Sequence, residues 1–171
     1  KEDIGGKEIE GAKIQVIDKD GNIVDEWTSG KEKHNIKNLV EGEKYTLHED
    51  VVVGEFVKAT DIEFEVTTEK ENQHIVMIDK LVEVTKTDLT TGEEIEGAEL
   101  QVVDEEGNII DEWTSTKEAH KVKGLEEGKT YKLIEKTAPY GYYQTEEIEF
   151  VVTTNKETLS TSYVIFNAIS K

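Results

Sequence analysis

Apolar and polar residues alternate along several short segments of the chain, among them residues 45–49, 62–66 and 148–152. A period of two is typical of strands that bury one face. Turn signals separate these segments, including Asp-Gly-Asn and Glu-Gly-Asn at Gly21 and Gly107. No stretch with helical periodicity competes. The pattern predicts an all-β protein built as an antiparallel β-sandwich.

The same pattern occurs twice. Residues 6–50 and 92–136 align without a gap at an offset of 86 residues, and 27 of the 45 positions are identical. Such self-similarity indicates two copies of one structural unit. We therefore predict two tandem sandwich domains, residues 1–80 and 81–171.

Charge and composition exclude several kinds of partner. The chain has 171 residues, 39 acidic and 20 basic, and a formal net charge of −19. A surface this acidic is unsuited to nucleic acid, whose binding depends on basic side chains that neutralise phosphates. It is equally unsuited to an anionic membrane, and no apolar run is long enough to span a bilayer. We expect neither nucleic acid nor membrane as a partner.

Each copy is small, and the chain contains no cysteine. Disulfides, thiolate metal sites and thiol catalysis are therefore excluded. Domains of about 85 residues bury a modest share of their surface, and secreted ones often need an additional link. The N-terminus shows no signal peptide, so we expect a mature or excised segment.

Alternation along the strands identifies three polar residues in each copy. Five of the six end an otherwise apolar strand face, and Lys1 is included because it aligns with Lys86. If those faces line one core, an amine, a carboxyl and an amide or acid meet in apolar surroundings. The six residues are Lys1, Glu49 and Asp79 in the first copy and Lys86, Glu135 and Asn167 in the second.

Such a group of side chains has a specific chemistry. Desolvation favours the neutral amine and the neutral carboxylic acid. A neutral amine is a nucleophile, and a protonated carboxyl can polarise a neighbouring carbonyl. Attack of the lysine nitrogen on the Asn or Asp side chain would release ammonia or water and form an amide. The alternative is that these are ordinary charged residues at strand ends, as charged side chains are mostly exposed.

The second copy contains the motifs Lys86-Thr87-Asp88, Glu94-Ile95-Glu96-Gly97-Ala98, residues 131–142 and Val164-Ile165-Phe166-Asn167. These motifs resemble one known family, the Cna protein B-type domains of Gram-positive surface adhesins and pilins, also described as SpaA-like or prealbumin-like. In the first copy, residues 74–79 resemble the peptide used as SpyTag, and residues 1–12 resemble its catcher. One departure is the segment 51–56, where the first copy lacks the Ala-Pro-x-Gly-Tyr sequence of the second.

The resemblance implies two Ig-like, prealbumin-like sandwiches, each with an intramolecular isopeptide bond. Lys1 would join Asp79 with Glu49 as the assisting acid. Lys86 would join Asn167, assisted by Glu135. The implied role is a structural stalk module of a cell-wall-anchored adhesin or pilin. It would be an extracellular monomer whose partners are neighbouring repeat domains, and no cofactor would be involved.

Other readings stay open. The chain could be a ligand-binding adhesin module that recognises host extracellular matrix protein, or a plain sandwich without cross-links. His34 and His120 occupy equivalent positions, but no histidine has a partner at metal-ligand spacing, so we expect no metal site. No Ser/His/Asp arrangement is visible either, so an enzyme with an external substrate is the least favoured class.

Overall fold

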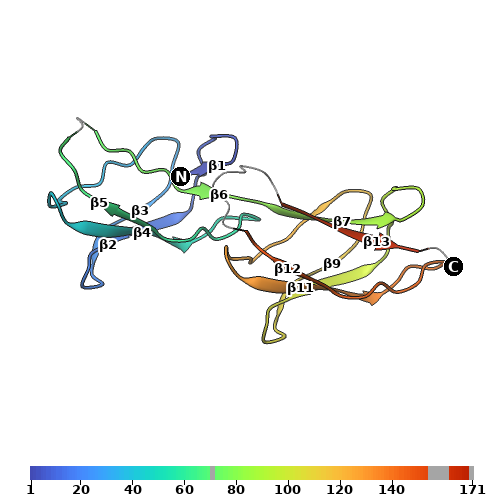
Figure 1. The fold of residues 1–171 in the computed structure, drawn as a ribbon. Coiled ribbons are helices and arrows are strands. Elements are labelled where there is room, and N and C mark those ends of the chain that lie inside the picture. The colour runs from blue at the N-terminus through green and yellow to red at the C-terminus, as the bar shows by residue number, and fades with distance from the viewer. Residues whose placement is uncertain (70–71, 154–161, 170–171) are drawn as a thin grey trace. The chain divides into compact units, whose positions relative to one another are not determined.

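The computed structural model describes residues 1–69, 72–153 and 162–169, with only the backbone for 162–167. Within these ranges the regular structure consists of strands (Figure 1). No described helix is long and apolar enough to cross a membrane. The strands are β1 (Glu2–Asp3), β2 (Lys13–Ile17), β3 (Ile23–Thr28), β4 (Lys44–Val51), β5 (Ile62–Glu65), β6 (Ile78–Asp79), β7 (Val82–Asp88), β8 (Glu99–Val103), β9 (Ile109–Thr114), β10 (His120–Lys121), β11 (Thr130–Thr137), β12 (Ile148–Val151) and β13 (Ser162–Ala168).

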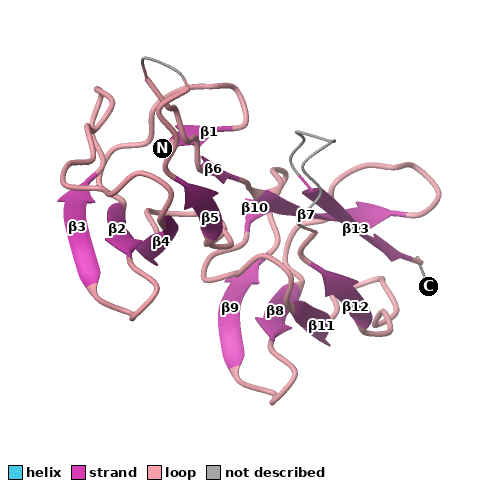
Figure 2. Cartoon of the chain, turned by 60° about the vertical axis from the view of Figure 1, so that its left-hand side comes forward, coloured by secondary structure: helices cyan, strands magenta, loops and turns pink. Residues whose placement is uncertain are grey.

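The chain forms two compact units, and each contains one four-stranded antiparallel sheet. The first unit comprises Lys1–Gly54 and Lys58–Lys80, and the second comprises Glu55–Val57 and Leu81–Lys171. The strand order is β3-β2-β4-β5 in the first and β9-β8-β11-β12 in the second (Figure 2). A smaller sheet forms the other layer, β1-β6 in the first unit and β10-β7-β13 in the second. The predicted all-β sandwich fold is confirmed.

The smaller sheets contain a feature that alternation could not indicate. In each unit the first strand pairs with the last, and this pair is parallel: β1 with β6 and β7 with β13. All other strand pairs within the described residues are antiparallel. The two ends of each repeat therefore lie side by side.

The alternating pattern reappears as alternating burial. Along β4 and β11 every second residue points into the core, and β7 is buried at alternate positions from Val82 to Asp88. Val16, Leu47 and Met77 belong to the core of the first unit. Each core thus lies between the four-stranded sheet and the strands of the smaller layer.

The turn signals also form as expected. The loop between β2 and β3 is closed by a hydrogen bond from Asp18 N to Asn22 O at 2.9 Å, with Gly21 at φ 84°. The equivalent loop between β8 and β9 has Gly107 at φ 86°. A positive φ is readily adopted by glycine, because glycine has no Cβ.

A buried serine is repeated in both units. Ser29 Oγ accepts a hydrogen bond from Ala12 N at 2.9 Å, and Ser115 Oγ accepts one from Ala98 N at the same distance. Ser115 is 6% exposed and Ala98 is fully buried. The hydroxyl satisfies an amide that water cannot reach.

Replacing Ser115 with Ala should therefore destabilise the second unit by about 1–3 kcal/mol, because Ala98 N would be left buried without its acceptor. The effect is measured by hydrogen exchange of the core strand Thr130–Thr137. Thr114→Ala, at an exposed position of β9, is the control and should change the exchange little. Equal protection in both variants would show that the serine hydroxyl contributes nothing.

Candidate functional site

The three residues expected to react in the first copy lie together in the core. Lys1 Nζ is 2.9 Å from Glu49 Oε1 and donates a hydrogen bond to Asp79 Oδ1. The three side chains are 2%, 0% and 0% exposed. A buried amine therefore contacts two buried carboxyl groups at once.

Local backbone structure explains why these side chains meet. The parallel register pairs Asp3 with Asp79, which puts Lys1, two residues earlier, on the same face as Asp79. Ile9 N donates to Lys1 O at 2.9 Å and holds the lysine backbone. Glu49 follows the buried Leu47 by two residues on β4, so it continues the core face of that strand.

Glu49 is further held by the loop that precedes β5. Its second oxygen, Oε2, accepts a hydrogen bond from Ala59 N at 2.9 Å. A β-bulge lies directly beyond Glu49, where Asp50 is skipped in the pairing of β4 with β2. Bulges of this kind are common beside functional sites because they redirect a side chain.

The second copy reproduces the amine–carboxyl contact. Lys86 Nζ is 3.1 Å from Glu135 Oε1, and both side chains are 0% exposed. Glu135 Oε2 accepts a hydrogen bond from Thr145 N at 2.6 Å, as Glu49 does from Ala59. In addition, Lys86 Nζ donates to Thr145 Oγ1 at 2.7 Å, a contact that alanine in the first copy cannot provide.

Burial changes the ionisation of the lysine. Desolvation lowers the pKa of Lys86 below its usual 10.5, although the neighbouring Glu135 acts in the opposite direction. A lower pKa increases the fraction of unprotonated amine at a given pH. The environment therefore makes this amine easier to deprotonate than an exposed lysine.

The side chain of Asn167 lies outside the described part of the structure, but its backbone belongs to β13. Asn167 pairs with Thr87 in the parallel ladder, and Phe166 pairs with Lys86. In the first copy Asp79, the counterpart of Asn167, pairs with Asp3. If the second copy had the same register, Asn167 would pair with Asp88, the counterpart of Asp3. The two copies thus differ by one residue in the register of this strand pair.

Sequence reasoning missed a second repeated group. His34 stacks on Trp27 with ring centroids 4.1 Å apart, and its Nε2 lies 2.9 Å from Asp25 Oδ2. Trp113, His120 and Asp111 repeat this arrangement with the same 4.1 Å stacking distance. The sequence did contain a signal for this group, because all three residues are identical in the two copies at an offset of 86. The group joins each edge strand to the segment that follows it.

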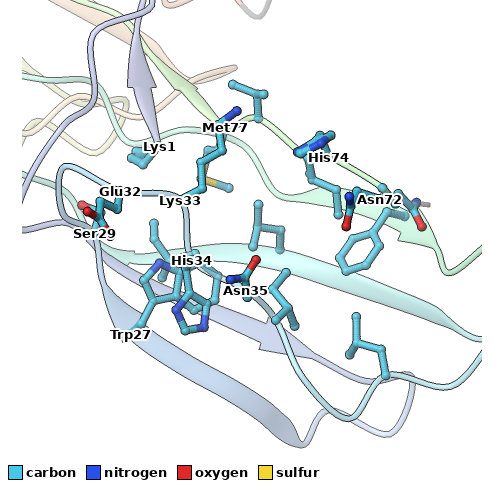
Figure 3. A pocket seen from close by; sticks show the side chains of 18 of the residues that line it. Lys1, Trp27, Ser29, Glu32, Lys33, His34, Asn35, Asn72, His74 and Met77 are labelled. Atoms are coloured by element: carbon cyan, nitrogen blue, oxygen red, sulfur yellow. The ribbon is translucent and has the colours of Figure 1, made fainter. Parts of the chain in front are cut away.

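A cavity of about 750 Å³ lies in the first unit, between its four-stranded sheet and the segments near residues 30–39 and 72–77. In Figure 3, Trp27 and His34 lie together on the sheet side, and Met77 lies on the opposite side. Lys1 is among the lining residues. Among the described residues of this layer, regular strand pairing involves β1 and β6, whereas the second unit has three strands in the equivalent layer.

Comparison with known proteins places the chain in a family. The family model of the SpaA prealbumin-like fold domain matches twice, at residues 1–81 and 80–165. No curated protein matches the sequence.

Several solved structures are similar over nearly the whole chain. A single-residue mutant of the shaft pilin SpaA from Lactobacillus rhamnosus GG is 12% identical, with 98% of this chain and 91% of that chain covered and a TM-score of 0.45. The pilus 2b backbone protein of group B streptococcus is 16% identical, with coverage of 99% and 83% and a TM-score of 0.46. A streptococcal ancillary pilin is 20% identical, with coverage of 99% and 60% and a TM-score of 0.42.

The family assignment rests on the two matches of the family model, which together extend over most of the chain, and the predicted family is confirmed. The chain belongs to the SpaA prealbumin-like fold domain family and contains two copies of that domain.

Proposed function

We propose that the chain is a structural stalk module of a Gram-positive surface protein, a pilin or an adhesin, and that each domain cross-links itself once. The two bonds are amides between Lys1 and Asp79 and between Lys86 and Asn167. The observation that carries the proposal is the buried cluster of the first copy, in which Lys1 Nζ contacts both Glu49 and Asp79.

The reaction in the first copy is the loss of water. The lysine ammonium transfers a proton to Glu49, and the resulting amine attacks Cγ of Asp79. The lysine nitrogen then loses a second proton. Both protons end on one oxygen of Asp79, which leaves as water, and Glu49 is regenerated. The burial of all three groups supports this route, because the amine and the carbon are held together without competing solvent.

In the second copy the same steps release ammonia. Two protons leave the Lys86 nitrogen through Glu135, and the amide nitrogen of Asn167 departs as ammonium. The lowered pKa of Lys86 supports its role as the nucleophile. The bond can form only if the side chain of Asn167 reaches Lys86. The strand register seen in the first copy, applied to β7 and β13, would allow this.

A cross-link of this kind suits a small domain without cysteine. The bonds would close loops of 78 and 81 residues, from 79 minus 1 and 167 minus 86. By the loop-entropy relation used for disulfides, each would stabilise its domain by about 4.5 kcal/mol. The charges favour the product as well, since an amide replaces buried ionisable groups whose desolvation is unfavourable.

The remaining parts of the proposal follow from the stalk role. The domains are residues 1–80 and 81–171, the protein lies outside the cell on the cell wall, and its neighbours are further repeat domains. Each cross-linking reaction occurs once per molecule, so the chain is not an enzyme in the sense of turning over a substrate.

The intact mass of the denatured protein tests the cross-links directly. We expect the mass calculated from the sequence minus one water and one ammonia. Peptide mapping should recover Lys1 joined to Asp79 and Lys86 joined to Asn167. A protein with the full unmodified mass would refute the proposal.

Glu49→Gln should abolish only the loss of water, and Glu135→Gln only the loss of ammonia, because each glutamate transfers protons in its own domain. Glu149→Gln, on an exposed position of β12, is the matched control and should leave both bonds intact. Loss of both bonds in a single variant would instead indicate a general folding defect.

The rate of bond formation should depend on pH through Lys86. Chain that intact mass shows to be unlinked is diluted from denaturant into buffers of increasing pH and quenched in acid. Because the reaction starts from the Lys86 ammonium, which supplies both protons of the departing ammonium, and because burial lowers the pKa of Lys86, the rate of the second bond should fall with rising pH, and the fall should begin below pH 10.5. A rate that holds up to pH 10.5 and falls only above it would show that the lysine titrates as an exposed side chain.

Recognition of host extracellular matrix protein is the second candidate function, and the cavity of the first unit is the observation that favours it. Trp27 lines this cavity, and Trp113 is its counterpart in the second unit. If the cavity binds such a ligand, Trp27→Ala should weaken binding to immobilised collagen or fibronectin at least tenfold. Trp113→Ala should not. Absence of binding by the unaltered chain rules out these two ligands.

A further inference from the structure

Thr145 contacts both Lys86 and Glu135, the proposed nucleophile and assisting acid of the second copy. Its backbone N–H donates to Glu135 Oε2 at 2.6 Å, and its hydroxyl oxygen accepts from Lys86 Nζ at 2.7 Å. Glu135 Oε1 lies 3.1 Å from the same nitrogen. One residue from the loop before β12 therefore connects the amine and the carboxyl.

The corresponding residue of the first copy is different. At an offset of 86 the position is Ala59, whose N–H donates to Glu49 Oε2 at 2.9 Å. The side chain of Ala59 has no hydroxyl. The contacts of Lys1 Nζ are with the carboxyl groups of Glu49 and Asp79. The backbone contact is common to both copies, and the hydroxyl contact belongs to the second alone.

This difference accompanies a difference in the residue to be joined. Asp79 carries a carboxyl group, which attracts a lysine ammonium by charge. Asn167, at the equivalent position, carries an uncharged amide and offers no such attraction. A hydroxyl at residue 145 supplies a second acceptor that orients the amine without adding a negative charge beside it.

Orientation of the amine matters for the reaction. A lysine side chain rotates about several bonds, and attack requires the nitrogen lone pair to face the carbonyl carbon. Contacts with Glu135 and Thr145 restrict the nitrogen in two directions. A misplacement of about 1 Å in such a geometry can reduce a rate roughly a hundredfold.

We propose that Thr145 is a positioning residue for amide formation in the second domain, and that its hydroxyl holds the Lys86 amine, to which the uncharged Asn167 offers no opposite charge. This inference rests on the proposed cross-link between Lys86 and Asn167. It assigns to residue 145 a role that the first domain does not need.

The test measures how fast the Lys86–Asn167 bond forms after dilution of the unlinked full chain from denaturant. Samples are quenched in acid and digested, and the joined peptide is quantified by mass spectrometry. Folding is followed separately by the fluorescence of the tryptophans. Thr145→Val, which removes the hydroxyl and keeps the shape, should slow bond formation about ten- to a hundredfold. Thr145→Ser should restore most of the rate.

Further variants separate positioning from a structural defect. Thr145→Ala introduces the residue found in the first domain and should be slow even if Thr145→Val does not fold. Thr114→Val, on the exposed face of β9, should leave the rate unchanged. In an Asn167→Asp background, Thr145→Val should slow bond formation less, because the aspartate carboxyl attracts the lysine by charge.

The outcomes distinguish this inference from the cross-link itself. If the unaltered chain never forms the Lys86–Asn167 bond, both are overturned. If that bond forms and Thr145→Val matches the unaltered rate, only the role of Thr145 is wrong. A serine variant as slow as the valine variant would also overturn it, since the hydroxyl would then not be the active group.

Discussion

A lysine amine buried against a glutamate carboxyl is the interaction around which each unit is arranged. Water hardly reaches either pair, Lys1 with Glu49 or Lys86 with Glu135. Burial of an isolated charge at such a place would be strongly unfavourable. Each unit therefore surrounds the pair with specific partners. A backbone amide from the loop after β4 or β11 donates to the glutamate in both copies. A lysine in this setting is either compensated by its neighbours or converted to a neutral group, and the proposed amide would achieve the second permanently.

The two copies meet this constraint with different residues. The first uses a second carboxyl, Asp79, and leaves alanine at position 59. The second uses the hydroxyl of Thr145 and carries an asparagine in β13. A carboxyl and a hydroxyl are alternative acceptors for the same ammonium, and only the carboxyl can also become the acyl group of an amide. The two copies thus differ both in the acceptor beside the lysine and in the residue that the proposed bond would join.

Much of this arrangement could be predicted from the sequence, because it depends on the alternation of apolar and polar residues along each strand and on which residues share a strand face. Alternation along β4 and β11 identified the buried faces, and parity placed Glu49 and Glu135 at their ends. The parallel pairing of first and last strands could not be predicted, since residues far apart in sequence make that contact. Thr145 lies in an irregular loop without a period, so nothing in its pattern marks it. The register of β13 likewise follows from tertiary packing rather than from local sequence.

The parallel pairing also explains how the proposed bonds would act under tension. Force on a stalk enters a domain through its first strand and leaves through its last. Without a cross-link, that force shears the hydrogen-bonded ladder between the two strands and then opens the core. Lys1 immediately precedes β1, and Asp79 is the last residue of β6, so an amide between them connects the entry and exit of the first unit directly. With that bond formed, tension passes through covalent bonds, and the four-stranded sheet remains outside the path of the force.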